Sequence, residues 1–196
     1  MIKAARPVLS AALLGALPLL AQAHTGSDAG THHGLLAGLT HPFTGLDHLA
    51  AMVAVGLWSA SGASVKGHRA ALLALPATFA SLLLVGALMA ATGLALPAIE
   101  PMIATSLLVL GLLLATRRGL PAPVAMALVG VFALFHGVAH GAELAGAAAL
   151  AGMVAGTVLL HAGGLLASLA LQRHQPGLIR WLGAGTALFG SALLLA

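Results

Sequence analysis

Cysteine is absent from this 196-residue sequence and charged side chains are scarce. Only 6% of the residues are charged, against 60% that are hydrophobic. Soluble globular proteins contain about 25% charged residues, and a surface so poor in charge would expose more apolar area than a soluble monomer tolerates. These proportions exclude a soluble domain and a disordered chain. The lack of cysteine excludes disulfide scaffolds and thiolate ligands, so any metal site must use nitrogen and oxygen atoms.

The net charge of +4 does not indicate a nucleic-acid partner. Binding to nucleic acid requires Lys and Arg clustered on one face, whereas this chain has only 8 basic residues in all. We therefore expect no nucleic-acid partner. What the chain does contain is ten histidines, and these need an explanation.

Residues 1–23 have the pattern of a secretory signal peptide. Two basic residues precede an apolar stretch over 8–20, and Ala21-Gln22-Ala23 is the small-x-small sequence typical of a cleavage site. Cleavage after Ala23 would make His24 the mature N-terminus. An uncleaved anchor is the alternative, and both versions place the following residues outside the cytoplasm.

Six apolar stretches follow, each near the roughly 20 residues that a helix needs to cross a bilayer. They are 42–61, 70–93, 97–115, 124–138, 147–171 and 178–195. The fourth is short unless it continues through His140. The prediction is an all-α membrane protein, a six-helix transmembrane bundle in one domain of residues 24–196. Its many small residues, such as Gly152, Gly156, Gly163 and Gly164, are expected to let helices pack closely.

Basic residues predict how this bundle is oriented. All six that remain after the leader fall in or beside the loops after the first, third and fifth spans: Lys66 and Arg69, Arg117 and Arg118, Arg173 and Arg180. Lys and Arg concentrate on the cytoplasmic side of membrane proteins. We therefore expect a multi-pass protein of the bacterial inner membrane with its N-terminus in the periplasm.

The first candidate metal site is the group His41, Asp47 and His48. Pro42 suits the first position of a helix. In a helix that begins there, His41 and His48 would be two turns apart on one face, with Asp47 beside them. Two imidazoles and a carboxylate suit a borderline divalent ion such as Ni, Co, Zn or Cu. The alternative is a His–Asp pair that only ties helices together.

The second candidate group is His136, His140 and Glu143. Their spacing of four and three residues places them on one stripe of a helix, at the outer end of the fourth span. A purely structural histidine pair is the alternative. An ionisable side chain inside a membrane span is costly, and it is by default a candidate functional residue.

Three further residues are candidates from their position. Glu100 begins the third span and is expected in the outer half of the membrane. His161 lies past the middle of the fifth span; it is either a packed structural residue or part of an ion path, with room left by the adjoining glycines. His24 would offer its amine and its imidazole as a chelate after cleavage, and the alternative is a polar, flexible leader.

Three segments of the sequence resemble the HupE/UreJ family, small bacterial membrane proteins associated with hydrogenase and urease gene clusters. They are His24-Thr25-Gly26, His41-Pro42-x-x-Gly45-x-Asp47-His48 with the following Leu49-x-Ala51-Met52-x-x-Val55-Gly56-Leu57-Trp58, and Phe135-His136-Gly137-x-Ala139-His140-Gly141-x-Glu143. The resemblance covers nearly the whole mature chain. It implies secondary transport of nickel, with cobalt as a second candidate, into the cell for assembly of hydrogenase or urease metallocentres.

The same resemblance implies which residues hold the metal. His41, Asp47 and His48 match the first family motif directly, and His136, His140 and Glu143 match the second. Glu100 and His161 are inferred from position alone. Nitrogen and oxygen sites favour Cu over Ni and Ni over Co, so the choice of nickel rests on the resemblance.

We expect no enzyme activity and no cofactor, since the ion is cargo. The sequence contains no Walker motif, so the membrane potential is the expected energy source. Two other functions stay open: an intramembrane Zn-dependent hydrolase, and a metal-binding assembly factor that does not transport. The expected partners are a divalent metal ion and the lipid bilayer.

Overall fold

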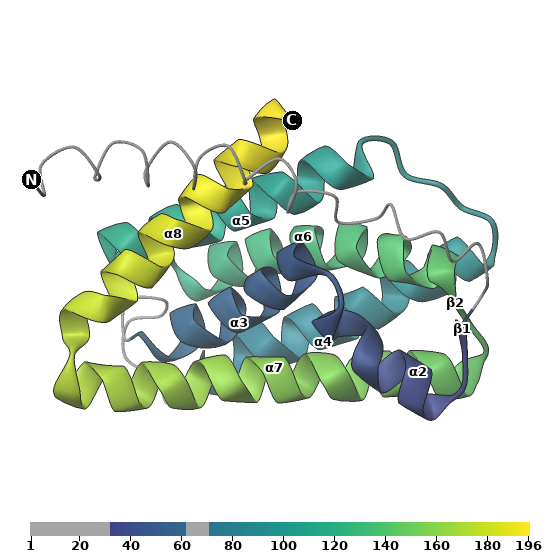
Figure 1. Cartoon of the computed structure of the whole chain (residues 1–196), viewed down its shortest axis with the longest axis horizontal. Helices are drawn as coiled ribbons and strands as arrows, with labels where there is room; N and C mark the ends of the chain where they lie inside the picture. The colour runs from purple at the N-terminus through teal and green to yellow at the C-terminus, as the bar shows by residue number, and fades with distance from the viewer. Residues whose placement is uncertain (1–31, 62–70) are drawn as a thin grey trace, which may run out of the picture.

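Long apolar helices make up the computed structural model, which describes residues 32–61 and 71–196 (Figure 1). The long helices are α3 (Leu46–Ala60), α4 (Ala71–Ala91), α5 (Ile99–Thr116), α6 (Ala122–Glu143), α7 (Ala147–His174) and α8 (Pro176–Leu195). The short elements are β1 (His32–His33), α2 (Leu35–Thr40), the 3₁₀ helix η1 (His41–Phe43) and β2 (Leu144–Ala145). The predicted leader and His24 lie outside the described residues.

Five of these helices, α4 to α8, are long and apolar enough to cross a membrane. A sixth span exists if the bent segment formed by α2, η1 and α3 is counted as one. Large apolar side chains cover the outside: Trp181 is 76% exposed and Leu188 is 72% exposed. A surface of this kind is stable against lipid rather than water. The chain is therefore an all-helical, multi-pass membrane protein.

Helix α6 extends further than hydropathy suggested. The predicted fourth span ended at residue 138, whereas α6 continues to Glu143. Polar residues in its last turns lowered the apparent hydropathy, yet His136 and His140 are buried inside the bundle. The polar side chains are tolerated at this depth because they face protein and not lipid.

Glycines allow the helices to approach closely within three pairs, α4 with α6, α5 with α8 and α3 with α7. A Cβ atom at Gly137 of α6 would overlap the Leu83 carbonyl of α4, and one at Gly164 of α7 would overlap the Val53 carbonyl of α3. The expected close packing is present at Gly164. It is not present at Gly163, which has open space around it.

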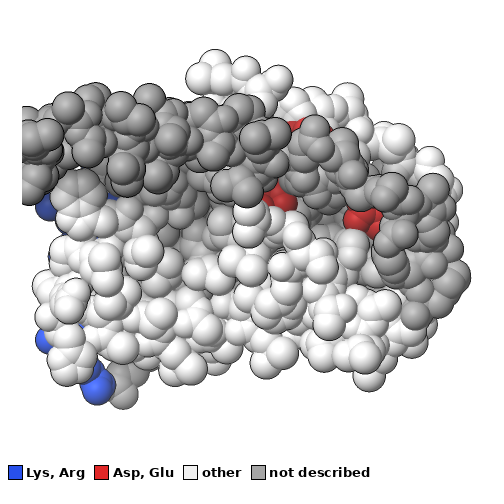
Figure 2. All heavy atoms as spheres, in the orientation of Figure 1, with Lys and Arg blue, Asp and Glu red and all other residues white. Residues whose placement is uncertain are grey.

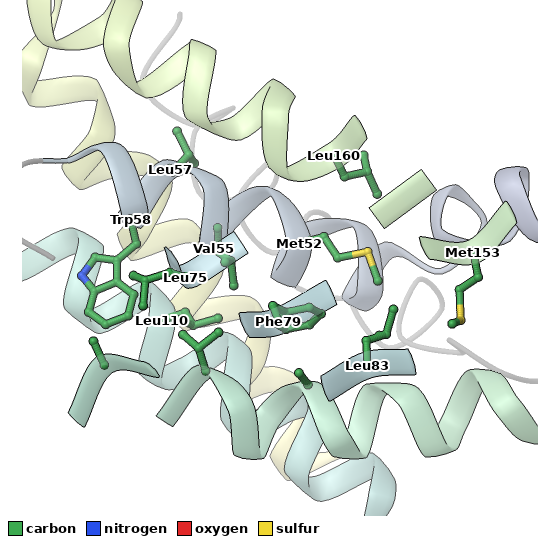
Figure 3. Close-up of a cluster of buried hydrophobic side chains, with 14 of the residues drawn as sticks. Met52, Val55, Leu57, Trp58, Leu75, Phe79, Leu83, Leu110, Met153 and Leu160 are labelled. Atoms are coloured by element: carbon green, nitrogen blue, oxygen red, sulfur yellow. The ribbon is translucent and has the colours of Figure 1, made fainter. Parts of the chain in front are cut away.

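The hydrophobic core draws buried side chains from all six long helices, α3 to α8. Met52, Trp58, Phe79 and Leu83 are fully buried there, and Figure 3 shows these side chains converging from separate helices. At the end of α3, the Trp58 indole donates a hydrogen bond to the Arg118 carbonyl at 3.3 Å. That bond ties the C-terminal ends of α3 and α5 to the same end of the bundle.

Charge separates along the length of the bundle. The described basic residues, Arg117, Arg118, Arg173 and Arg180, lie where α5 and α7 end and where α8 begins. We call this the basic end. Helix α6 starts there and α7 returns to it, so Glu143 at the end of α6 lies at the opposite end. Figure 2 shows the same separation, with Lys and Arg at one end and the acidic atoms away from it.

Candidate metal centre

A sharp bend separates His41 from His48. The segment Leu35–Phe43 and helix α3 meet at 82°. Pro42 lies in the first turn of η1, and Gly45 has an extended backbone with φ −92° and ψ 120°, so the helical hydrogen bonding is interrupted between them. The prediction of one continuous helix face carrying both histidines is therefore wrong. Hydropathy alone does not reveal such a break, because the residues on both sides of it are apolar.

Helix α6 presents its three polar residues on one stripe. His136, His140 and Glu143 all fall within its last two turns, and side chains four and three residues apart lie on the same side of a helix. His136 is fully buried, His140 is 2% exposed and the Glu143 side chain is 38% exposed. The stripe thus runs from the interior toward the surface.

The α2–η1–α3 segment and α6 bring the histidines of the two motifs together. His41 Nε2 lies 2.9 Å from Glu143 Oε2, and the His41 and His140 rings are 4.8 Å apart between centroids. Each of His41, His140 and Glu143 offers one ligand atom, and these atoms lie within 4.8 Å of one another. Nitrogen and carboxylate oxygen at such separations could converge on one divalent cation after small side-chain rotations.

His48 continues the arrangement into the core. Its ring centroid is 4.2 Å from that of His140 and 4.8 Å from that of His136. We call His41, His48, His136 and His140 the histidine cluster. Its exposure falls from 13% at the His41 side chain to 1% at His48 and zero at His136. The imidazoles therefore form a continuous series from the surface to the interior.

Asp47 fixes the chemical state of His48. Its Oδ1 atom accepts the His48 backbone N–H at 2.8 Å and also contacts His48 Nδ1 at 2.9 Å. A carboxylate oxygen can only accept, so Nδ1 carries a proton, and in the neutral ring His48 Nε2 carries the lone pair. Metal-binding histidines are oriented in this way, since a hydrogen bond from one ring nitrogen prepares the other as a ligand.

Ser106 plays the equivalent part for His136. The Ser106 hydroxyl is 2.6 Å from the Ile103 carbonyl, to which it donates, and 3.0 Å from His136 Nε2. Because a hydroxyl has one proton, the serine oxygen accepts from His136 Nε2–H. The lone pair of His136 is then on Nδ1. A single serine in an apolar helix therefore fixes a tautomer on the neighbouring helix.

Asp47 Oδ2 is buried and has no hydrogen-bond partner among the described residues. An ionised oxygen in a low-dielectric interior is costly unless it is paired with a cation or a donor. Its position beside His48 therefore favours a positive charge in this part of the bundle. A bound divalent cation would supply that charge.

His161 lies deeper and belongs to a separate group. Its Nδ1–H donates to the Met52 carbonyl at 2.8 Å, and its ring meets the Phe79 ring edge to face at 5.1 Å. Phe79 also contacts His136, at 5.6 Å between ring centroids. The expectation that the adjoining glycines leave room is wrong for Gly164, where the backbone of α3 fills the space, whereas Gly163 is exposed with open space around it.

Glu100 is the remaining candidate among the described residues, and it lies outside the close group. Glu100 is exposed in the first turn of α5 and is not one of the ligand set His41, His140 and Glu143. His24 lies outside the described residues. The backbone at His32 pairs with Leu144, so β1 lies beside the end of α6.

Sequence reasoning missed several groups that orient the histidines. They are Ser106, the Met52 carbonyl and the Phe79 ring. An isolated serine in an otherwise apolar span was the one signal available for Ser106, since polar side chains there usually bond to backbone or to a neighbouring helix. A backbone carbonyl and a phenyl ring carry no comparable signal in the sequence.

The chain is similar to known proteins over most of its length. Residues 11–193 match a family model described as HupE / UreJ protein. A protein named Protein HupE from Rhizobium leguminosarum bv. viciae is 44% identical over 185 residues, which cover 92% of this chain and 93% of that protein. No solved structure matched the chain.

Proposed function

We propose, from the premise that this chain belongs to the HupE/UreJ family, that it is a permease importing divalent nickel for metalloenzyme assembly. Cobalt is the second candidate cargo. The protein acts as a transporter and not as an enzyme. The ligands are the histidine cluster and Glu143, with Asp47 orienting His48, and they lie at the end of the bundle remote from the arginines.

The observation that carries this proposal is the histidine cluster itself. Four imidazoles from two separate parts of the chain meet inside an apolar bundle, and two of them, His48 and His136, have one ring nitrogen engaged by an oxygen. A hydrogen bond at one ring nitrogen orients the imidazole and sets its tautomer, as it does in metal-binding histidines.

The distribution of charge supports inward transport. The basic end carries the described arginines, which are expected on the cytoplasmic side. The cluster then opens toward the periplasm through His41 and Glu143, where the ion exchanges water for protein ligands. The leader 1–23 is removed after Ala23, and the mature His24 adds an amine and an imidazole for initial capture.

Membrane potential drives the ion inward. It supplies about 2.3 kcal/mol per charge per 100 mV, which doubles for a divalent ion. Several weakly binding ligands in series suit ion transport better than one closed, tightly binding site, because the ion must leave each site in order to move. Glu100, exposed at the start of α5, contributes negative charge near the entrance and attracts cations.

The experiment is uptake of radioactive nickel by cells that lack other nickel importers. We compare the wild type with His41→Ala, Asp47→Asn and His48→Ala, each at matched amounts in the membrane. The control is His174→Ala, because His174 is exposed at the basic end of α7. We expect at least a tenfold loss of uptake in the three cluster variants and none in the control.

Two results would contradict the proposal in different ways. Uptake by the cluster variants equal to that of the wild type would show that these residues are not the site. A wild type that binds nickel but moves none would identify a metal-binding assembly factor. Competition by excess Co, Zn or Cu in the same assay ranks the ions.

A further inference from the structure

Helix α7 carries a line of buried and half-buried polar side chains that are not part of the histidine cluster. Thr157, His161, Ser168 and Gln172 are spaced by four, seven and four residues, so they share one face of the helix. Thr157 and Ser168 are fully buried and His161 is 2% exposed. Polar groups inside a membrane helix are costly and mark candidate ion paths.

This face of α7 packs against α3. The His161 imidazole is bonded to the Met52 carbonyl of α3, and the Gln172 amide donates to the Ala60 carbonyl at 2.6 Å. Gly56 and Gly164 bring the two helices close enough that a Cβ at either would overlap the opposite backbone. The polar line therefore runs along a fixed helix interface toward the basic end.

His161 is prepared as a ligand on this line. Its Nδ1–H is donated to Met52, so Nε2 carries the lone pair, and Nε2 is buried with no partner among the described residues. Thr157 Oγ1, one turn earlier on α7, is likewise buried and without a partner in the described part of the chain. Two unsatisfied acceptor atoms on one face are what a partly dehydrated cation needs.

The depth of His161 in the bundle fits an ion site that follows the histidine cluster on the way to the basic end. Met52 is four residues after His48 on α3, which is about 6 Å further along the helix. Side chains lean toward the N-terminus of their helix, and α7 begins at the cluster end, so the His161 side chain leans toward the cluster. Phe79 touches both His136 and His161, and it lies between the two groups.

We infer that His161 Nε2 and Thr157 Oγ1 form a second, inner site for the transported divalent cation, on a polar line that leads along the α3–α7 interface. The inference rests on the proposed transport function. One imidazole and one hydroxyl hold an ion weakly, which suits a transient site between the cluster and the basic end. The histidine cluster captures the ion, and His161 accepts it from there.

The substitution His161→Asn distinguishes a role as an ion ligand from a purely structural role. The Asn amide nitrogen takes nearly the position of His Nδ1 and can still donate to the Met52 carbonyl, but no ligand atom replaces Nε2. A residue that only ties α3 to α7 would tolerate this change. We expect the rate of radioactive nickel uptake to fall at least tenfold, with nickel affinity of the purified protein changed by less than about threefold.

Thr157→Val provides the second variant, since valine keeps the shape and removes only the hydroxyl. Uptake is expected to fall severalfold while the thermal stability stays equal or rises, because a buried unsatisfied group has been removed. The matched controls are His174→Asn, on the exposed end of α7, and Thr186→Val, whose hydroxyl bonds to the Leu182 carbonyl of α8. Both controls are expected to transport as the wild type does.

Normal uptake by His161→Asn and Thr157→Val, in cells where the wild type imports nickel, would overturn the inner site and leave the proposed function intact. Loss of uptake together with an equal loss of nickel affinity would also overturn it, since His161 would then belong to the capture site. No uptake by the wild type itself would instead refute the transport function.

Discussion

Asp47→Asn is the substitution that tests most directly how the cluster binds metal. Asp47 Oδ1 accepts two hydrogen bonds from His48. An Asn side chain keeps an oxygen in that position, because the His48 backbone N–H is a fixed donor to it. The variant therefore keeps the His48 tautomer and its ring orientation. What it loses is the negative charge of the carboxylate. Part of that charge is on the buried Oδ2 atom, which has no partner among the described residues.

The size of the effect follows from the geometry. An ion bound at His48 Nε2 lies roughly 7 Å from Asp47 Oδ1, when the width of the imidazole and a metal–nitrogen bond of about 2.1 Å are added to the hydrogen bond. A divalent ion and a carboxylate at that separation interact by about 1 kcal/mol at the dielectric constant of water and about 5 kcal/mol at an effective value of 20. Loss of the outer partner of a ligating histidine typically costs 10- to 100-fold in affinity, or about 1.4–2.8 kcal/mol. We expect that range.

The assay is titration calorimetry of nickel into the purified protein in detergent at pH 7.5, with thermal unfolding measured in parallel. Thermal stability is expected to change little, because Asn keeps the oxygen that accepts both hydrogen bonds from His48 and removes a buried charge whose desolvation is costly. Asp47→Ala, which also loses the two hydrogen bonds, is expected to bind more weakly still. A nickel affinity for Asp47→Asn within twofold of the wild type would refute the reasoning, since the carboxylate charge would then play no part in binding.

Three further predictions follow from the same geometry. Ser106→Ala removes the acceptor for His136 Nε2–H and is expected to weaken nickel binding about tenfold, measured by the same titration; unchanged affinity would exclude His136 from the site. Imidazoles bind metal only when deprotonated, so uptake is expected to fall as the pH is lowered, and an uptake rate that is flat between pH 5.5 and 7.5 would argue against histidine ligands. Gly137→Leu places a side chain against the Leu83 backbone of α4 and is expected to destabilise the fold by about 3 kcal/mol or more, which a lower melting temperature would show. Gly163 has open space around it, so Gly163→Leu is the control and is expected to change the melting temperature little.

Local properties of the sequence predicted the class of fold and one part of the site. Long apolar runs predicted a helical membrane bundle, which is confirmed, because the need to satisfy every backbone group in lipid leaves few other structures. Helical spacing also predicted that His136, His140 and Glu143 share one stripe, since that depends only on a regular α6. The leader, the orientation and the assignment of metal ligands remain predictions.

Other features could not be read from local sequence. The bend at Gly45 separates His41 from His48, and the packing of the bent segment against α7 places both histidine rings against His140 of α6. The filled space at Gly164 depends on how closely α3 approaches α7. Each of these features is set by contacts between segments that are distant in the sequence, whereas hydropathy describes one segment at a time.

The sequence by itself determined that this chain is a membrane bundle with few charges and an unusual number of histidines, because composition and helical period act locally. The tertiary structure alone decided which histidines meet and which ring nitrogen each one presents. Those choices depend on single hydrogen-bond partners from other helices: Ser106 of α5 for His136 and the Met52 carbonyl of α3 for His161. A partner on another helix becomes a neighbour only when the helices pack.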